Sequence, residues 1–358
     1  MKTMKNILKI WMLIAVLGAF TGCTDEEAEV LQKPYERSEE YYANIRAFKE
    51  SDHCRTFVYY AAWAPLEGID GYKDPASYGE RLIGLPDSLD IVNLWMSIPS
   101  NDPEDTRYAP VAYADMVYCQ QKLGTRFVSH SDASHNQVFE YNGKYYNVLS
   151  GNGDGSSASS PIGGVAALEA YGQTILDDIY KYGLDGTDID YEPNDQTWTG
   201  SVNGRNRFLI LVEYLGQFIG PQGSDPSKLL IVDYFGSAPN SGVGPYLNYL
   251  VKQQYSDQLG TSESVLNSNY NSVSSWCPSE KYIICEQFGN SQMGPNGGQN
   301  FTYGGKTMIS IEAYARWAST NNRGGFGAYY VDRNYYSNSG IPYYEFRRAI
   351  QIATHEDM

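Results

Sequence analysis

The chain has 358 residues, of which 26 are Lys or Arg and 42 are Asp or Glu, so its formal net charge is −16. This acidic balance disfavours nucleic acids and anionic membrane surfaces as partners, because both carry negative charge. It is neutral toward uncharged glycans. The 32 tyrosines favour a carbohydrate partner, since their flat rings stack on sugars while their hydroxyls form hydrogen bonds. The alternative is that tyrosine simply fills the boundary of a large core.

The first 22 residues have the pattern of an export signal. Lys2, Lys5 and Lys9 form a basic start, and Ile10–Phe20 is an apolar run too short to span a membrane as a mature helix. Removing residues 1–22 takes away these lysines and no acid, so the formal charge moves from −16 to −19. We therefore expect a protein that leaves the cytoplasm.

The segment after this signal predicts a lipid anchor. Phe20-Thr21-Gly22-Cys23 resembles a bacterial lipobox, in which cleavage leaves Cys23 lipidated at the new N-terminus. The acidic run Thr24–Glu29 resembles the tag that sends Bacteroidetes lipoproteins to the cell surface. We expect a monomer held in the outer membrane by lipid alone. The alternative is a plain secretory peptide followed by a solvated acidic run.

The remaining cysteines and histidines argue against a metal site. Cys54, Cys119, Cys277 and Cys285 form no CxxC pair and have no histidine nearby at metal-ligand spacing. The four histidines of the chain are too scattered to bind a metal together, and no Gly-rich phosphate loop follows a strand. We expect no metal and no cofactor. Four cysteines in an exported protein allow three disulfide pairings, and the sequence leaves the choice open.

Secondary structure is predicted from about Glu39 onward. Residues 23–52 are interpreted as an acidic tether leading into a first helix over Glu39–Phe48, and further helices are expected over Val111–Leu123, Asn206–Ile219 and Tyr343–Ala353. Short apolar runs between them predict eight strands: Thr56–Ala61, Asp90–Trp95, Arg126–Ser129, Thr187–Tyr191, Leu229–Tyr234, Tyr249–Tyr255, Tyr282–Glu286 and Phe326–Val331.

Strands that are apolar throughout and alternate with helices indicate a parallel sheet covered on both faces. Eight such units in about 330 mature residues fit a single (β/α)8 TIM barrel over residues 53–358. An open doubly wound sheet is the alternative. Val138–Val148 consists of two short alternating runs around Asn142-Gly143, which predicts a β-hairpin. Its tyrosines could line a glycan cleft, or the hairpin could be a rim decoration without function.

The most informative stretch follows the turn at Asp185-Gly186. Asp188, Asp190 and Glu192 alternate with Ile189 and Tyr191, so a strand places the three carboxyls on one face. Three stacked acids repel each other, so some of them must hold or share a proton. Such a row is costly as architecture alone and points to acid–base chemistry. The alternative is an acidic strand end that binds calcium or faces water.

Asp185–Glu192 resembles the DGxDxDxE motif of glycoside hydrolase family 18, the chitinases and endo-β-N-acetylglucosaminidases. The predicted strand that carries the motif is fourth of eight, as in that family, and this favours the barrel over the open sheet. The resemblance implies a retaining reaction in which the substrate's own 2-acetamido oxygen is the nucleophile.

The resemblance also implies roles for individual residues. Glu192 is expected to be the general acid and then the base, with its pKa raised by the charge on Asp190. Asp190 is expected to hold the acetamide N–H and stabilise the oxazolinium, and Asp188 to share a proton with Asp190. Tyr255 is expected to donate its hydroxyl to the acetamide oxygen, or else to be an ordinary barrel tyrosine. Asp185 and Gly186 are expected to shape the turn.

The expected substrate is an N-glycan or another GlcNAc-containing oligosaccharide, bound by Gln253, Tyr329, Tyr59 and Trp95. The Gln253-x-Tyr255 pattern resembles endo-β-N-acetylglucosaminidases of gut Bacteroidetes more than chitinases, many of which carry Ser-x-Gly-Gly where Ser129–Asp132 stands here. Tyr329 stands where the family usually places a Trp. We expect cleavage of the GlcNAc-β1,4-GlcNAc core. The alternatives are a chitinase or chitooligosaccharidase, or a non-catalytic surface glycan-binding protein; high-mannose and complex glycans are not distinguished.

Overall fold

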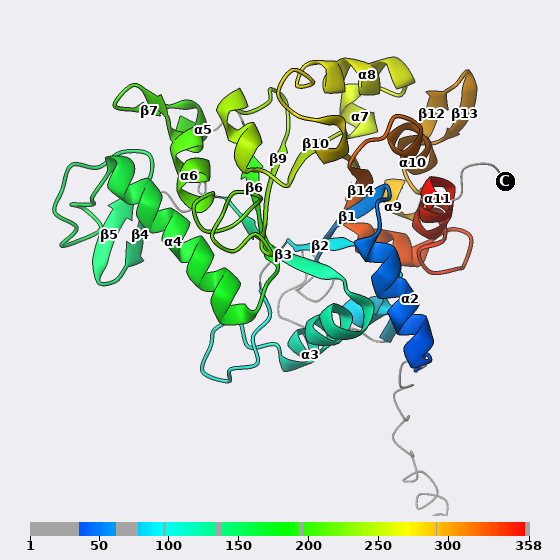
Figure 1. Cartoon of the computed structure of the whole chain (residues 1–358), viewed down its shortest axis with the longest axis horizontal. Coiled ribbons are helices and arrows are strands. Elements are labelled where there is room, and N and C mark those ends of the chain that lie inside the picture. The colour runs from blue at the N-terminus through cyan, green and yellow to red at the C-terminus, as the bar shows by residue number, and fades with distance from the viewer. Residues whose placement is uncertain are drawn as a thin grey trace, which may run out of the picture. The chain divides into compact units, whose positions relative to one another are not determined.

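A computed structural model describes residues 36–61, 78–95, 98–132, 138–192, 196–290 and 292–354. Within this part of the chain eight parallel strands close into a barrel in the order β1-β14-β11-β10-β9-β6-β3-β2, which confirms the predicted (β/α)8 fold (Figure 1). The strands are β1 (Arg55–Tyr60), β2 (Ile91–Leu94), β3 (Arg126–Ser131), β6 (Gly186–Tyr191), β9 (Leu229–Tyr234), β10 (Tyr249–Gln253), β11 (Tyr282–Gln287) and β14 (Gly325–Tyr329).

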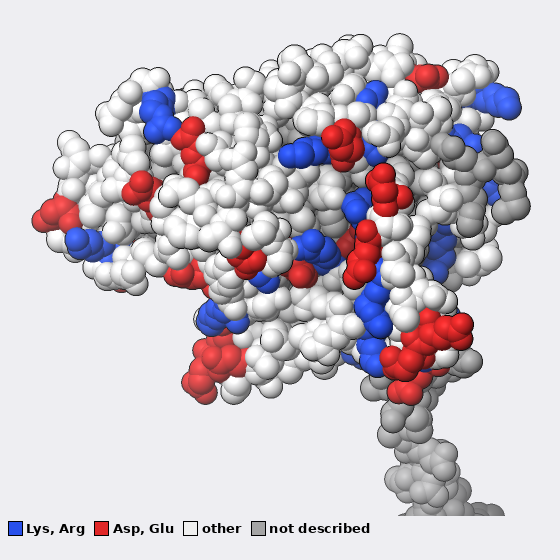
Figure 2. Space-filling view, in the orientation of Figure 1, with Lys and Arg blue, Asp and Glu red and all other residues white. Residues whose placement is uncertain are grey.

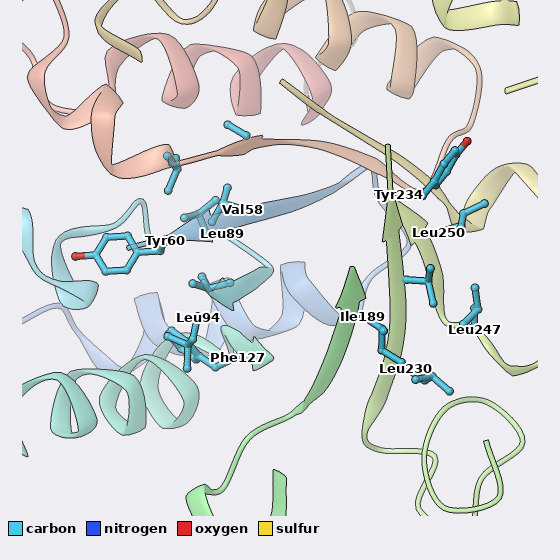
Figure 3. Close-up of a cluster of buried hydrophobic side chains, with 14 of the residues drawn as sticks. Val58, Tyr60, Leu89, Leu94, Phe127, Ile189, Leu230, Tyr234, Leu247 and Leu250 are labelled. Carbon is cyan, nitrogen blue, oxygen red and sulfur yellow. The ribbon is translucent and has the colours of Figure 1, made fainter. Parts of the chain in front are cut away.

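The strands are apolar on both faces because both faces are buried. Outward side chains such as Val58, Ile189 and Leu230 pack in one large core between the barrel and its helices (Figure 3). Inward side chains such as Phe57 and Ile231 fill the interior of the barrel. The interior is therefore a packed core, and polar inward residues can reach solvent only near the strand ends.

Four of the helices had been predicted from the sequence. α2 (Glu39–Glu50) begins at an N-cap in which Ser38 accepts a hydrogen bond from the Tyr41 backbone. α3 (Pro110–Tyr118) continues as a π-turn and ends at Gly124, whose φ of +70° suits glycine. The helices predicted over Asn206–Ile219 and Tyr343–Ala353 correspond to α6 (Arg207–Leu215), which ends earlier than expected, and to α11 (Tyr344–Thr354). The helices that were not predicted are α4 (Gly164–Tyr182), α5 (Gln196–Thr199), α7 (Ser256–Leu259), α8 (Glu263–Asn271), α9 (Met293–Asn296) and α10 (Ser310–Thr320).

The third strand was predicted to end at Ser129, but β3 continues to Ser131. Two other strands were predicted to extend too far. The sixth strand was expected to reach Tyr255, but β10 ends at Gln253 and Tyr255 is the residue immediately before α7. The eighth was expected to reach Val331, but β14 ends at Tyr329 because Tyr330 has a positive φ of 60°. Both differences lie at the carboxyl ends of the strands, where the chain turns into the loops above the barrel.

The predicted hairpin is present as β4 (Val138–Tyr141) and β5 (Lys144–Asn147), which lie beside α4 (Figure 1). The Tyr141 hydroxyl donates to Asp177 of α4 at 2.9 Å, and the Phe139 ring contacts Tyr171 of the same helix. These contacts support the interpretation of the hairpin as a decoration packed on an outer helix.

Two further hairpins, which were not predicted from the sequence, are β7 (Ser201–Val202) with β8 (Arg205–Asn206) and β12 (Asn300–Tyr303) with β13 (Lys306–Ile309).

The expected lipid anchor, disulfides and surface charge can be compared with the structure only in part. Cys23 and the proposed signal lie outside the described residues. Cys54, Cys119, Cys277 and Cys285 are all free thiols in the structure. In the part of the chain that the structure describes, no helix combines the length and apolarity needed to cross a membrane. Figure 2 shows acidic and basic side chains interspersed on the visible face, separated by wide areas of neither charge.

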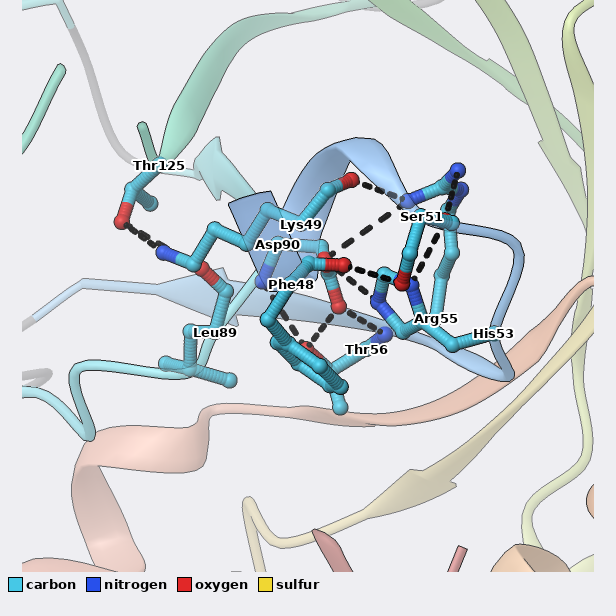
Figure 4. A network of polar contacts seen from close by, with 9 residues as sticks. All are labelled: Phe48, Lys49, Ser51, His53, Arg55, Thr56, Leu89, Asp90 and Thr125. Atoms are coloured by element: carbon cyan, nitrogen blue, oxygen red, sulfur yellow. Dashed lines mark hydrogen bonds and ion pairs between the residues drawn. The ribbon is translucent and has the colours of Figure 1, made fainter. Parts of the chain in front are cut away.

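A polar network fixes the amino-terminal ends of the first strands (Figure 4). The buried Asp90 carboxyl, just before β2, accepts hydrogen bonds from the backbone N–H and the hydroxyl of Thr56 on β1, at 2.8 and 2.9 Å. His53 Nε2 lies 2.9 Å from the same carboxyl. Lys49 of α2 donates to Thr125 at 2.7 Å, which ties the helix to the start of β3. This network stabilises the amino-terminal end of the barrel, which lies opposite to Asp190 and Glu192.

We expect Asp90→Ala to destabilise the fold, because the Thr56 backbone N–H and hydroxyl would lose their acceptor inside the protein. Leaving a buried donor without its acceptor typically costs about 1–3 kcal/mol. Glu50→Ala, at an exposed position on the same side of the barrel, should change the free energy of unfolding by less than about 0.5 kcal/mol. Guanidinium unfolding of both variants measures the difference. Equal effects would contradict the role given to the network.

Candidate active site

The acidic motif lies on β6 with the alternation that its sequence predicts. Ile189 and Tyr191 belong to the outer core, whereas Asp188 and Asp190 point into the barrel interior and are 0% and 8% exposed. Glu192 follows the last residue of β6 and is exposed. The row of carboxyls therefore runs from the buried interior to the mouth of the barrel at the carboxyl ends of the strands, where the active sites of such barrels lie.

The first two residues of the motif shape the turn into β6. Gly186 has a φ of +145°, and a Cβ there would lie 2.1 Å from the Leu229 carbonyl oxygen. No side chain fits at this position, because adjacent backbones approach too closely. The Asp185 carboxyl accepts hydrogen bonds from the Phe127 backbone at 2.9 Å and from Gln120 at 2.8 Å. Both residues thus anchor the strand at the end of the barrel opposite Glu192.

The next barrel strand brings a fourth acid to the motif. Asp233 of β9 stands opposite Asp190 in the parallel register and is 0% exposed. The Nε2 group of Gln253, on β10, donates to Asp233 Oδ2 at 2.6 Å and to Asp190 Oδ1 at 3.1 Å. One neutral amide thus bridges two carboxyls from adjacent strands.

The deepest acid has a neutral donor as well. Asn93 Nδ2, on β2, donates to Asp188 Oδ2 at 2.8 Å. Tyr59, on β1, points its buried hydroxyl toward Asp188 and Asp233 without the geometry of a full hydrogen bond. Among the described residues no hydrogen bond joins Asp188 to Asp190, so the proton sharing between them stays a prediction.

Burial dominates the electrostatics of these acids. It raises the pKa of Asp190 to about 10, with further contributions from the charges of Asp233 and Glu192. Burial also raises the pKa of Asp233 to about 7, against the hydrogen bond from Gln253, which lowers it. The pKa of Asp188 is raised well above its usual value by burial and then by the Asp233 charge. The interior acids therefore hold at least one proton at neutral pH, as the repulsion within the motif predicted.

Aromatic rings form a continuous wall above the acids. Trp95 and Tyr329, at the ends of β2 and β14, have ring centroids 4.9 Å apart, and Tyr255 lies 6.0 Å from Tyr329. Burial, and then the Asp233 charge, raise the pKa of the Tyr255 hydroxyl well above 10, so it remains a hydrogen-bond donor at neutral pH. These rings are half-buried, so each presents part of its surface to the barrel mouth.

The structure brings together all the site residues predicted from the sequence except Cys23, which lies outside the described residues. Glu192, Asp190, Asp188 and Gln253 belong to the carboxyl row and its bridge, and Tyr255, Tyr329 and Trp95 to the aromatic wall. Tyr59 is 1% exposed, and its ring contacts Trp95 and Tyr329 at 5.8 and 5.7 Å. It therefore supports the wall from beneath, where a ligand at the surface would not touch it.

Asp233 and Asn93 belong to the site but were not predicted from the sequence. Each is a single polar residue near the carboxyl end of a strand whose other residues are apolar, in Leu229–Tyr234 and Ile91–Leu94. That signal was available, because the carboxyl ends of consecutive barrel strands meet at one rim. An isolated Asp or Asn at a strand end is common, however, and only the closed barrel shows that these side chains meet Asp188 and Asp190.

Among the described residues, pockets lie at both ends of the barrel. One of about 510 Å³ is lined by Lys49, Arg55, Asp90 and Arg126, at the amino-terminal end, and holds none of the predicted site residues. The other, which we call the rim pocket, has a volume of about 450 Å³ and is lined by Asp257, Asn290, Gln292, Met293, Asn296, Gly298, Gln299, Asn300 and Ile309. It lies among the loops that follow β10 and β11, on the side of Tyr255.

The donor set of the site does not resemble a metal centre. Among the described residues no group of three or more His, Cys, Asp or Glu side chains is arranged to hold a metal ion. The closest polar partners of the interior acids are the amides of Gln253 and Asn93. Neutral N–H donors at these distances satisfy carboxyls and would repel a cation.

A closed barrel with a row of acids at its carboxyl-terminal mouth and an aromatic wall above them defines a glycoside-hydrolase type of site. The sequence matches the profile of glycoside hydrolase family 18, BT1044-like, over residues 24–352, and the chain belongs to this family. The resemblance predicted from Asp185–Glu192 is thereby confirmed.

Individual relatives agree with this assignment. Endo-β-N-acetylglucosaminidase F2 of Elizabethkingia meningoseptica is 26% identical over 306 residues, which are 82% of this chain and 77% of that protein. EndoSd, an endo-β-N-acetylglucosaminidase of Streptococcus dysgalactiae, is 29% identical over 201 residues, which are 51% of this chain but only 23% of that longer protein. The solved structure of a BT1044 variant shares the fold, with a TM-score of 0.64 and 21% identity, over 88% of this chain and 93% of that one.

We expect Gln253→Leu to destabilise the protein more at pH 8 than at pH 5. The Gln253 hydrogen bond lowers the pKa of Asp233, so its loss raises that pKa further. A carboxyl whose pKa is raised by folding contributes stability below its unfolded pKa and loses it as the pH rises through the folded value. The cost at pH 8 should be roughly 2 kcal/mol, typical of a hydrogen bond to a charged group. Denaturant unfolding at both pH values measures it; a pH-independent loss would contradict the bridge.

Proposed function

We propose that this protein is a retaining endo-β-N-acetylglucosaminidase that cleaves the GlcNAc-β1,4-GlcNAc core of N-glycans, with the substrate's acetamide oxygen as nucleophile. The observation that carries the proposal is the row of Asp188, Asp190 and Glu192, which climbs from the interior to the mouth beside Gln253 and Tyr255. The relatives named above bear the name of this activity, which supports the same choice.

Glu192 is the group placed to exchange protons with the substrate. It stands at the mouth of the barrel, exposed, at the top of the row. In the first half of the reaction its carboxyl protonates the glycosidic oxygen as the bond to the anomeric carbon breaks. In the second half the resulting carboxylate takes a proton from water, which attacks the same carbon. The residue thus ends the cycle protonated, and the two displacements retain the configuration.

Asp190 faces the acetamide from below. Its carboxyl accepts the acetamide N–H and balances the positive charge that develops on the oxazolinium ring. A cation close to a carboxyl lowers its pKa, so the proton that burial keeps on Asp190 can leave as the oxazolinium forms. The interior acids Asp188 and Asp233 are the acceptors within the same cluster. The acetamide oxygen in turn needs a donor, and the protonated Tyr255 hydroxyl supplies it.

The surroundings of the mouth suit a branched sugar chain. Trp95 and Tyr329 offer ring surfaces on which a pyranose can stack. The rim pocket is lined largely by the amides of Asn290, Gln292, Gln299 and Asn300, which both donate and accept hydrogen bonds as sugar hydroxyls do. We infer that the chitobiose core lies over the carboxyls and that a glycan arm extends into the rim pocket.

Incubation with a glycoprotein, followed by mass analysis of the released glycans and the remaining protein, tests this function. An endo-β-N-acetylglucosaminidase leaves one GlcNAc on each processed asparagine. Release of GlcNAc oligomers from chitooligosaccharides, with intact glycoprotein, would indicate the chitinase alternative. Glycan binding without cleavage of either substrate would indicate a surface glycan-binding protein.

We also propose that the protein is lipid-anchored through Cys23 and faces the outside of the cell, on the strength of the lipobox and the acidic run behind it. Substitution of Cys23 by Ser should move the protein from the membrane fraction to the soluble fraction. Protease treatment of whole cells should degrade the natural protein if it is at the surface. A Cys23→Ser protein that stays in the membrane would refute the anchor.

We expect Glu192→Gln to fold normally, bind glycan and lose nearly all turnover. The substitution keeps the shape of the side chain but removes the proton that the leaving oxygen needs, an effect of about 10²–10⁴-fold or more. Glycan release per hour and calorimetric binding measure the two properties separately. More than about a tenth of the natural rate would place the general acid elsewhere. Asp190→Asn should lose less, because its amide still contacts the acetamide.

Substrate assistance itself makes a separate prediction. The first product should have the β configuration, and a substrate with glucose in place of the GlcNAc at the cleavage site should be inert, because its 2-hydroxyl cannot form the oxazolinium. A thiazoline analogue should inhibit as a mimic of the intermediate. Tyr255→Phe should weaken both inhibition and turnover. Proton NMR and a thiazoline titration measure these; an α-configured first product would contradict the mechanism even if Glu192 proved essential.

A further inference from the structure

Asp233 has no part in the roles that the motif implies, although it is the acid closest in register to Asp190. We propose that Asp233 is a positioning residue for the reaction: through Gln253 and through its own charge it fixes where the Asp190 carboxyl sits and at which pH it ionises. The proposal rests on the proposed function for the reaction itself, whereas the coupling between the two carboxyls can be tested without it.

The geometry leaves little freedom to either carboxyl. Asp190 and Asp233 are register partners on β6 and β9, so both side chains leave adjacent backbones toward the interior at the same height. The two N–H bonds of the Gln253 amide point one to each carboxyl, at 3.1 and 2.6 Å. Asp233 and Gln253 are 0% and 5% exposed, so water cannot replace this bridge. The position of Asp190 therefore depends on a partner two strands away.

The electrostatic interactions of Asp233 also support a positioning role. After burial itself, Asp233 is the largest influence that raises the pKa of Asp188 and of Asp190. Its charge and that of Glu192 also act on each other, although Glu192 stands at the mouth. One carboxyl thus couples to Asp188, Asp190 and Glu192. Electrostatic coupling is mutual, so the loss of the Asp233 charge must make all three of them easier to ionise.

The remaining groups that face Asp233 do not cancel this coupling. They are Tyr59 from β1, Tyr255 from the turn after β10 and Cys285 from β11, and its charge raises the pKa of each. All three are neutral at physiological pH. The nearest basic side chain on β10, Lys252, points outward: its Nζ donates to the Gly236 carbonyl at 3.2 Å and feels the Glu192 charge. Asp132, at the end of β3, acts on Asp190 as a further negative charge.

A purely structural Asp233 would serve only to hold Gln253 in place. Such a residue would reduce stability when replaced and leave the pH dependence of catalysis unchanged. A positioning Asp233 predicts instead that its replacement raises the stability of the protein and changes the pH dependence of catalysis. Asp233→Asn keeps an oxygen that can accept from Gln253 but removes a buried negative charge, so it should relieve repulsion within the cluster.

The experiment measures kcat against pH for the natural protein and for Asp233→Asn, on a glycoprotein N-glycan. In the substrate complex the acidic limb reports release of the Asp190 proton, which the developing oxazolinium charge favours, and the alkaline limb needs a protonated Glu192. Loss of the Asp233 charge makes both groups ionise at lower pH, so the whole bell should move to lower pH. On the alkaline limb this is about a tenfold loss for each pH unit of displacement. A bell reduced in height without displacement would overturn the proposal.

Thermal unfolding of the same variants provides a second measurement. Burial raises the pKa of Asp233, so this carboxyl destabilises the folded protein increasingly as the pH rises toward that pKa. Asp233→Asn should therefore have a higher Tm than the natural protein at pH 8, and the difference should shrink toward pH 5. If the Asn variant does not fold, Asp233→Ser, which also removes the charge, decides the pH profile. A lower Tm at pH 8 for a folded variant would show that Asp233 is structural.

Asp115→Asn is the matched control. Asp115 is also a buried carboxyl, but it lies on α3 and pairs with Arg81 outside the barrel interior. Its replacement should lower Tm and leave the pH profile unmoved; a displaced profile would make the shift a general effect of losing a buried acid. If the natural protein cleaves no GlcNAc glycan, the proposed function fails, and the Tm comparison at two pH values still decides whether Asp233 and Asp190 are coupled.

Discussion

The structure depends on keeping several carboxyls buried on adjacent parallel strands. Isolated buried charge is expensive, yet Asp190 and Asp233 lie at one height in the interior and Asp188 lies one level deeper. The barrel meets this cost in two ways. It leaves protons on part of the set, and it brings amide donors from β2 and β10 to Asp188, Asp190 and Asp233. Neither is available to a strand in isolation, because the donors arrive only when the sheet closes.

The two ends of the barrel treat acids differently. At the amino-terminal end Asp90 and Asp185 receive backbone N–H groups, and Asp90 also lies near His53 and Arg55. At the carboxyl-terminal end the side-chain amides of Asn93 and Gln253 donate to Asp188, Asp190 and Asp233, and the nearby Lys252 points away from them. The backbone and basic partners of the acids at the amino-terminal end offset their negative charge, which fits a structural role. The interior acids at the other end lack basic partners on β10, so their protonation can change. This contrast agrees with the general division of such barrels into a stabilising end and a functional end.

Local sequence patterns determine much of this structure. The eight strands follow from their apolar runs, and the faces of Asp188, Asp190 and Ile189 follow from the period of two. Tyr255 was placed at the correct rim but in the wrong element, because the apolar pattern of β10 does not show where the chain leaves the sheet for α7. Asp233 was missed for another reason. Its importance arises from the register between β6 and β9, and no pattern within Leu229–Tyr234 contains that register. The hairpins at Asn203-Gly204 and Gly304-Gly305 carried turn signals as clear as the one at Asn142-Gly143.

The choice of glutamine at position 253 follows from the same constraint. A lysine or arginine there would bind both carboxyls more strongly, but its charge would keep them ionised and remove the proton that the cluster holds. Glutamine donates to both and adds no charge. The neighbouring residue is a lysine, and it faces outward onto the ring of Tyr234, 4.5 Å from the centroid. A slip of β10 by one residue would exchange the two side chains and place a cation among the acids. The register of β10, fixed on one side by the pairing of Leu250 with Val232 and on the other by that of Gln253 with Cys285, is therefore as important to the chemistry as the acids themselves.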